Sequence, residues 1–135
     1  MIEFPFVEFS HPVFGTVLRP VANVLLSHEA YALSVEMLVD SGADLSMIPK
    51  TIGDQLGFIL ERGEMVYTVG GIGGGIPVVY RSVFLTVGET SLPIRIAWAL
   101  SDEIPSVLGR LDVFDHFDIE FVQHRKVVIF REPSE

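Results

Sequence analysis

The sequence contains no cysteine, so neither a disulfide framework nor a thiolate metal site can form, and a reducing compartment is allowed. Basic residues are also scarce, because 9 lysines and arginines stand against 18 aspartates and glutamates and the net charge is -9. This charge argues against nucleic acid or an anionic membrane as the main partner. No apolar run approaches the ~20 residues of a membrane span, and the N-terminus lacks the basic and apolar regions of a secretion signal. We therefore expect a cytoplasmic protein.

The length of 135 residues and the hydrophobic content of 49% are sufficient for one core but small for two, so we expect a single domain over residues 1–135. Apolar residues mostly alternate with polar ones in short stretches, and turn residues separate these stretches. Such a pattern is typical of an all-β fold. The predicted strands cover residues 4–9, 16–26, 30–39, 64–69, 76–87, 91–99, 117–122 and 126–130.

Two stretches depart from the alternating pattern and are predicted to be short helices. The first covers residues 50–56 and follows Pro49, and the second covers residues 110–117, where apolar side chains recur at helical spacing. A third unusual stretch, residues 70–75, holds five glycines and one isoleucine between two predicted strands. Glycine leaves the backbone almost unrestrained, so this stretch is interpreted as the mobile tip of a hairpin.

The chemistry of the sequence centres on Asp40 in Val39-Asp40-Ser41-Gly42-Ala43. This aspartate follows an apolar run, so we expect it where a buried strand ends and small residues turn the chain sharply. Such a position presents a carboxylate on a loop that a rigid scaffold holds in place. The tripeptide alone is a weak signal, because an aspartate at a strand end also forms an ordinary Asx-type turn without any catalytic role.

Two further features follow in order: the glycine-rich hairpin, and then Val107-Leu108-Gly109-Arg110 directly before the second predicted helix. Together with the Asp40 turn, they resemble the retropepsin-like aspartic proteases, and the resemblance spans about residues 30–130. It implies a closed β-barrel or sandwich. It also implies that the turn carries the catalytic aspartate, that the hairpin is a flap over the substrate, and that the Gly-Arg element packs beneath the active-site loop.

The resemblance assigns a catalytic role to three residues of the turn. Asp40 would be the catalytic carboxylate, and Ser41 would hydrogen-bond across a dimer axis to the same loop of a second copy, since a hydroxyl both donates and accepts. Gly42 would let its amide approach the Asp40 carboxylate without a side chain in between.

The resemblance also assigns binding and supporting roles. Asp44 would form a bidentate ion pair with Arg110 and so tie the active-site loop to the helix. The residues implied to contact substrate are Ala43, Asp44, Gly70, Gly71, Ile72, Gly73 and Gly74. Those implied to support the loop from below are Leu108, Gly109 and Arg110.

The mechanism that the resemblance implies is hydrolysis of a peptide bond by two carboxylates that share a proton. Since the sequence holds a single Asp-[Ser/Thr]-Gly triplet, the second carboxylate would be Asp40 of an identical chain. We therefore expect a homodimeric aspartic endopeptidase that binds an extended peptide or protein substrate and needs neither a metal nor an organic cofactor. The alternative is a catalytically silent domain of the same fold that dimerises or binds peptides.

The sequence departs from the family pattern in two places. An acidic or amide residue often follows the arginine of the Gly-Arg element, but here Leu111 follows it, so a polar contact near the helix start is missing or comes from Asp112. Residues 1–29 exceed what a minimal retroviral enzyme needs, and their role is open between an extra strand and part of a dimer contact. Zinc and nucleotide binding find little support, because the histidines are scattered and no Lys-[Ser/Thr] follows the glycines.

Overall fold

The computed structural model describes residues 1–70 and 74–133 of the chain. This part is built mainly from β-strands, as predicted, and no helix in it is long and apolar enough to cross a membrane. The strands are β1 (Ile2–Pro5), β2 (Val7–His11), β3 (Gly15–Arg19), β4 (Val21–His28), β5 (Tyr31–Val39), β6 (Ser46–Ile48), β7 (Tyr67–Val69), β8 (Ile76–Val87), β9 (Thr90–Ala99), β10 (Val107–Leu108), β11 (Asp118–Val122) and β12 (Val127–Arg131). The helical segments are α1 (Lys50–Gln55), η1 (Arg110–Phe114) and η2 (Gln123–Arg125).

Seven strands form one sheet in the order β4-β5-β10-β6-β9-β8-β7, and β4 also pairs with β8, so the sheet closes into a barrel. Alternation along the strands explains the closure: in β8, for example, Val83, Leu85 and Val87 point into the barrel while the residues between them face outwards. The largest buried side chain is Trp98 of β9. The barrel therefore holds most of the main hydrophobic core, which continues outside it to Phe117, Val128 and Phe130.

The short strand β10 is central to the architecture because it joins segments far apart in sequence. It pairs in parallel with the end of β5 through Val107 with Leu38 and Leu108 with Val39, and antiparallel with β6 through Met47. The end of β5 consequently lies beside the start of η1. Sequence periodicity missed both β6 and β10, since strands of two or three residues show no alternation.

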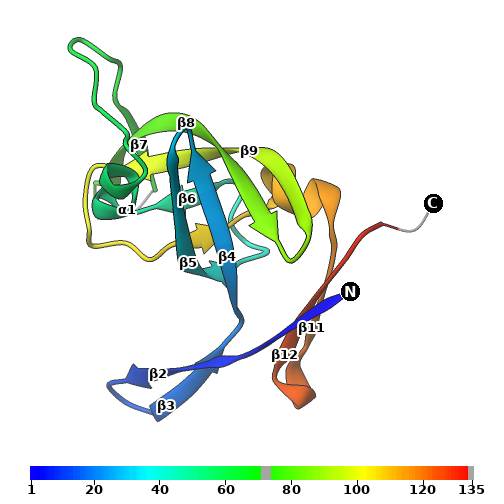
Figure 1. Cartoon of the computed structure of the whole chain (residues 1–135). Helices are drawn as coiled ribbons and strands as arrows, with labels where there is room; N and C mark the ends of the chain where they lie inside the picture. Colours follow the sequence, from blue (N-terminus) through cyan, green and yellow to red (C-terminus); the bar gives the residue numbers. More distant parts are fainter. Residues whose placement is uncertain (71–73, 134–135) are drawn as a thin grey trace.

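The N-terminal strands correct two of the predictions. Residues 4–9 do not form one strand: β1 pairs with β12 in a separate sheet of order β1-β12-β11, and after Phe6 the chain turns away to form β2, which pairs with β3. Residues 16–26 likewise divide at Pro20, which lacks an amide hydrogen for a ladder bond. Figure 1 shows the β2–β3 hairpin projecting below the barrel, apart from the strands β11 and β12.

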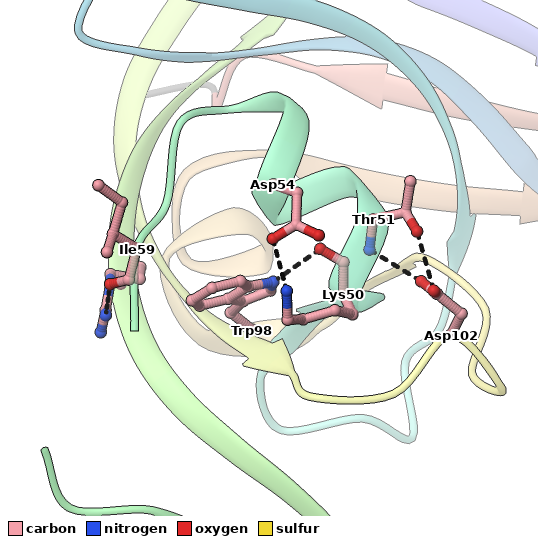
Figure 2. Close-up of polar contacts among 7 residues, drawn as sticks. Lys50, Thr51, Asp54, Ile59, Trp98 and Asp102 are labelled. Carbon is pink, nitrogen blue, oxygen red and sulfur yellow. Dashed lines mark hydrogen bonds and ion pairs between the residues drawn. The ribbon is translucent and has the colours of Figure 1, made fainter. Parts of the chain in front are cut away.

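Helix α1 lies at the place predicted for it and is held from several sides. Asp102 accepts hydrogen bonds from the amide and the hydroxyl of Thr51, both 2.8 Å long, and the Trp98 indole donates to the Lys50 carbonyl at 3.0 Å (Figure 2). Gly53 of α1 lies directly on the indole, because a Cβ at this position would come within 2.1 Å of the Trp98 Nε1. The helix and the barrel core are thus packed at the closest distance that a glycine allows.

The second predicted helix and one strand are shorter than expected. Leu111 has an extended ψ of 129° and Asp112 has a positive φ of 69°, so the chain becomes helical only after Asp112. The predicted strand over residues 64–69 is reduced to β7, because the Glu64 amide donates to the Glu61 carbonyl in a turn instead of to a neighbouring strand.

Candidate active site

Asp40 lies directly after β5. Its amide donates to the Leu108 carbonyl over 3.0 Å, and the preceding amide, of Val39, donates to the Pro20 carbonyl over 2.8 Å. The strand end is thus hydrogen-bonded on both sides, to β10 and to the residue before β4. Val39 is buried whereas Asp40 is only partly so, which places the Asp40 carboxylate at the surface of a rigid scaffold.

The turn after Asp40 folds back on its own carboxylate. The Gly42 amide donates to Asp40 Oδ1 over 2.9 Å, and the Ala43 amide donates to the Asp40 carbonyl over 3.2 Å. A Cβ at position 42 would lie 3.2 Å from the same Oδ1, which is closer than side chains usually come. This is an Asx-type turn, and it also fixes the direction of the carboxylate. Ser41 is exposed, and its hydroxyl has no hydrogen-bond partner within residues 1–70 and 74–133.

The loop that carries Asp40 is fastened from below by the Gly-Arg element. The Arg110 amide donates to the Ala43 carbonyl and the Leu111 amide donates to the Asp44 carbonyl, each over 2.9 Å. These bonds continue the pairing of β5 with β10, so the Asp40 loop and the start of η1 are joined by backbone hydrogen bonds.

Gly109 and Ser46 complete this fastening in the interior. The Gly109 amide donates to the Ser46 hydroxyl over 3.0 Å, and a Cβ on Gly109 would come within 2.5 Å of the Leu45 carbonyl carbon. Only glycine allows this approach. Ser46, a buried polar side chain, was not predicted as a site residue, because one serine within a polar turn carries no periodic or motif signal.

The expected ion pair between Asp44 and Arg110 is absent, although both residues are described and their backbones are adjacent through the bonds above. The aspartate two positions after Arg110 supplies the polar contact instead: Asp112 accepts bonds from the Arg95 amide, Nε and Nη2, at 2.8, 3.0 and 2.9 Å. The Arg95 guanidinium holds the pKa of Asp112 below its ordinary value. A pair 17 residues apart in sequence could not be read from the local pattern.

An open groove of about 740 Å³ adjoins the Asp40 loop on the side of β8 and β9. Asp44 reaches its wall and Asp40 itself does not. The groove is lined by Asp44, Leu45, Tyr80, Arg81, Ser82, Arg95 and Leu111. Ala43, the other residue of the turn expected to contact substrate, is also outside this lining.

The glycine-rich stretch joins two paired strands, as predicted: β7 and β8 run antiparallel with Val69 opposite Ile76. Gly70 and Gly74 are exposed and have φ angles of 91° and 106°, which side chains rarely tolerate. The remaining predicted residues of this hairpin, Gly71, Ile72 and Gly73, lie outside the described residues. Among the residues described, no group of three or more histidines, aspartates and glutamates is placed to hold a metal ion.

Comparisons with known proteins agree on the architecture. No protein-family model matches the sequence, and no curated protein matches it. Among solved structures, the EIAV protease in complex with the inhibitor HBY-793 matches with a TM-score of 0.52 and 24% identity, over 76% of this chain and 88% of that one. A retropepsin-like aspartic protease from Rickettsia conorii matches with a TM-score of 0.63 and 15% identity, over 95% of this chain and 89% of that one. The chain therefore has the fold of the retropepsin-like aspartic proteases.

Proposed function

We propose that this chain, which has the retropepsin-like fold, is an aspartic endopeptidase that works as a homodimer and uses Asp40 as its catalytic carboxylate. The observation that carries the proposal is the turn at Asp40: a carboxylate at the end of a buried strand, oriented by the Gly42 amide at 2.9 Å, on a loop bonded to the Gly-Arg element beneath it. This construction preorganises one acidic group at the surface. Acid–base catalysis requires such an oriented group, whereas a turn with a purely structural role does not require it.

The chemistry needs two such groups. One carboxylate, ionised, takes a proton from water as the water attacks the peptide carbonyl, and the other, protonated, donates to the carbonyl oxygen. Within the described residues, four other aspartates accept side-chain hydrogen bonds, and all four serve the scaffold. Asp54 pairs with Lys50, Asp102 holds the start of α1, Asp112 pairs with Arg95, and Asp115 accepts the Asp112 amide hydrogen. The second carboxylate is therefore assigned to Asp40 of a second copy, related by a two-fold axis. No metal or organic cofactor takes part.

The groove beside Asp44 supports an extended peptide as the substrate. It has room for several side chains, and its lining combines apolar groups with charged ones. The β7–β8 hairpin is assigned the role of a flap. Its Gly70 and Gly74 lack the side chains that would restrict backbone rotation, as closure over a bound peptide requires.

The experiment that tests the proposal replaces Asp40 with asparagine and mixes the variant with wild-type chains. Asp40→Asn should abolish hydrolysis of a degenerate peptide pool while folding and dimerisation stay unchanged, since the amide keeps the shape but cannot act as base. After co-refolding with a ninefold excess of the variant, only about a tenth of wild-type subunits pair with one another, so activity should fall to about a tenth. Asp54→Asn is the matched control. The same excess of this variant should leave the activity per chain unchanged, because Asp54 pairs with Lys50 on the surface.

Two results would contradict the proposal. Turnover by Asp40→Asn would remove Asp40 from the mechanism, and full activity in a verified heterodimer population would show that one chain holds both catalytic groups. A wild-type dimer that binds a statine peptide yet cleaves nothing across a wide pH range would instead identify a silent peptide-binding domain.

A further inference from the structure

The β2–β3 hairpin pairs with no other strand within the described part of the chain. Its strands pair only with each other, and neither contributes a residue to the hydrophobic core. Figure 1 shows it extending below the barrel. A two-stranded hairpin alone is at best marginally stable in water, so its order calls for a packing partner.

The tip of this hairpin presents apolar side chains that are held in place. Val13 and Phe14 are each 76% exposed, and their amides both donate to Nδ1 of His11 over 3.1 Å. The His11 and Phe14 rings also lie 4.8 Å apart. Large apolar groups that are exposed on an ordered backbone are typical of an interaction surface, because little backbone entropy remains to be lost on docking.

The base of the hairpin lies beside the proposed catalytic aspartate. β3 ends at Arg19, and the next residue, Pro20, accepts the amide hydrogen of Val39, the residue before Asp40. If two Asp40 carboxylates share a proton, the two-fold axis passes close to this base. Each strand of the hairpin has five residues and rises about 3.3 Å per residue. The tip therefore lies roughly 15 Å from the base, and the base is next to the axis.

We propose that the β2–β3 hairpin is a dimerisation arm whose tip, Val13 and Phe14, packs against the second copy of this chain. The proposal rests on the proposed homodimer. Because a two-fold interface is isologous, each copy extends one arm and receives one, and four tip side chains become buried. The contact would supply the partner that the hairpin lacks in the single chain, and it explains the N-terminal residues that the proposed chemistry does not use.

The test is the double variant Val13→Ser, Phe14→Ser in the full chain. Its dimer dissociation constant, from sedimentation equilibrium over a dilution series, should rise about a hundredfold or more, because apolar contacts are lost in both arms. At concentrations where the variant is dimeric, kcat should match that of the wild type. The matched control is Ile59→Ser, Leu60→Ser, an adjacent apolar pair that is 72% and 45% exposed in a loop, and it should leave the dissociation constant unchanged.

A second variant covers the case in which the first misfolds. The chain has no cysteine, so Phe14→Cys can carry a single photoactivated cross-linker at the tip. Irradiation of the dimer should join the label to the second copy, as mass spectrometry of the linked peptides would reveal.

The outcomes separate this inference from the proposed function. An unchanged dissociation constant, or a label that never reaches the second copy of a proven dimer, contradicts the proposed dimerisation arm. Neither result affects the proposed peptidase function. A wild-type chain that stays monomeric at every concentration overturns both. An unchanged dimer that cleaves folded proteins more slowly after the tip substitution would assign the hairpin to substrate docking and also overturn the arm.

Discussion

Replacing Gly42 with alanine is a direct test of the geometry at Asp40. The backbone at Gly42 does not need a positive φ, so alanine fits it without strain. The new Cβ would lie 3.2 Å from Asp40 Oδ1 and near no other atom within 4 Å outside its chain neighbours. The methyl group should therefore push the carboxylate aside by a few tenths of an ångström and weaken the hydrogen bond from the residue-42 amide, while the rest of the fold is left untouched.

The size of the effect follows from that one hydrogen bond. A hydrogen bond from an amide to an ionised group contributes about 1.5–3 kcal/mol, and about 1.36 kcal/mol corresponds to a tenfold change in rate. Since the bond would be distorted rather than removed, kcat/KM should fall about 10- to 100-fold. Gly42 is exposed, so the free energy of unfolding should change by less than about 0.5 kcal/mol.

The assay combines peptide hydrolysis with thermal unfolding followed by circular dichroism. Gly63→Ala is the matched control, because a Cβ there meets nothing within 4 Å but φ is +78°. It should lower stability by about 1 kcal/mol and leave hydrolysis unchanged, the reverse of Gly42→Ala. Full activity of Gly42→Ala, or a loss of stability equal to that of the control, would refute the idea that this glycine serves the carboxylate.

Two further predictions concern the scaffold. Gly53→Ala should destabilise the protein by about 2 kcal/mol or more in thermal or urea unfolding despite the better helix propensity of alanine, because its Cβ would meet Trp98 at 2.1 Å; unchanged stability would mean that the indole can move freely. The hydrogen bond from Arg81 lowers the pKa of Glu64 from 4.5 to about 2. Stability from this pair should therefore be present above pH 4.5 and be lost as the pH falls from 4.5 towards 2. In that window the melting temperature of Glu64→Gln should fall less than that of the wild type, and parallel curves would contradict the assignment.

The strands that the sequence predicts well are long and have distinct ends. Strand β8 matches its predicted residues 76–87, because a long stretch rich in β-branched and aromatic residues lies between Gly75 and Gly88. The N-terminal strands were predicted less well, since alternation continues while the pairing partner changes. Propensity and periodicity mark a segment as a strand without stating its partner, and the local signals of the two breaks are Pro5 and Pro20.

The candidate site likewise combines features that the sequence predicts with features that it does not. The turn at Asp40 and the glycine at position 109 follow from local motifs, and the contact from the Gly42 amide to the carboxylate was expected and is present. The contacts of Asp112 and Ser46 depend on segments that meet only after the barrel closes. Their partners could not be read from the sequence. The family resemblance implied an ion pair between Asp44 and Arg110, whereas the structure has one between Arg95 and Asp112.

The position of Trp98 gives the protein a built-in optical reporter. It is the single tryptophan of the chain, it is buried in the barrel against Gly53, and its indole is bonded to the Lys50 carbonyl. Its fluorescence emission should shift to longer wavelength when the barrel opens to water. The β2–β3 hairpin holds no tryptophan, so separation of two folded copies should leave the emission spectrum almost unchanged. A dilution series in which activity falls at constant emission would therefore report dissociation, and a spectral shift would report unfolding.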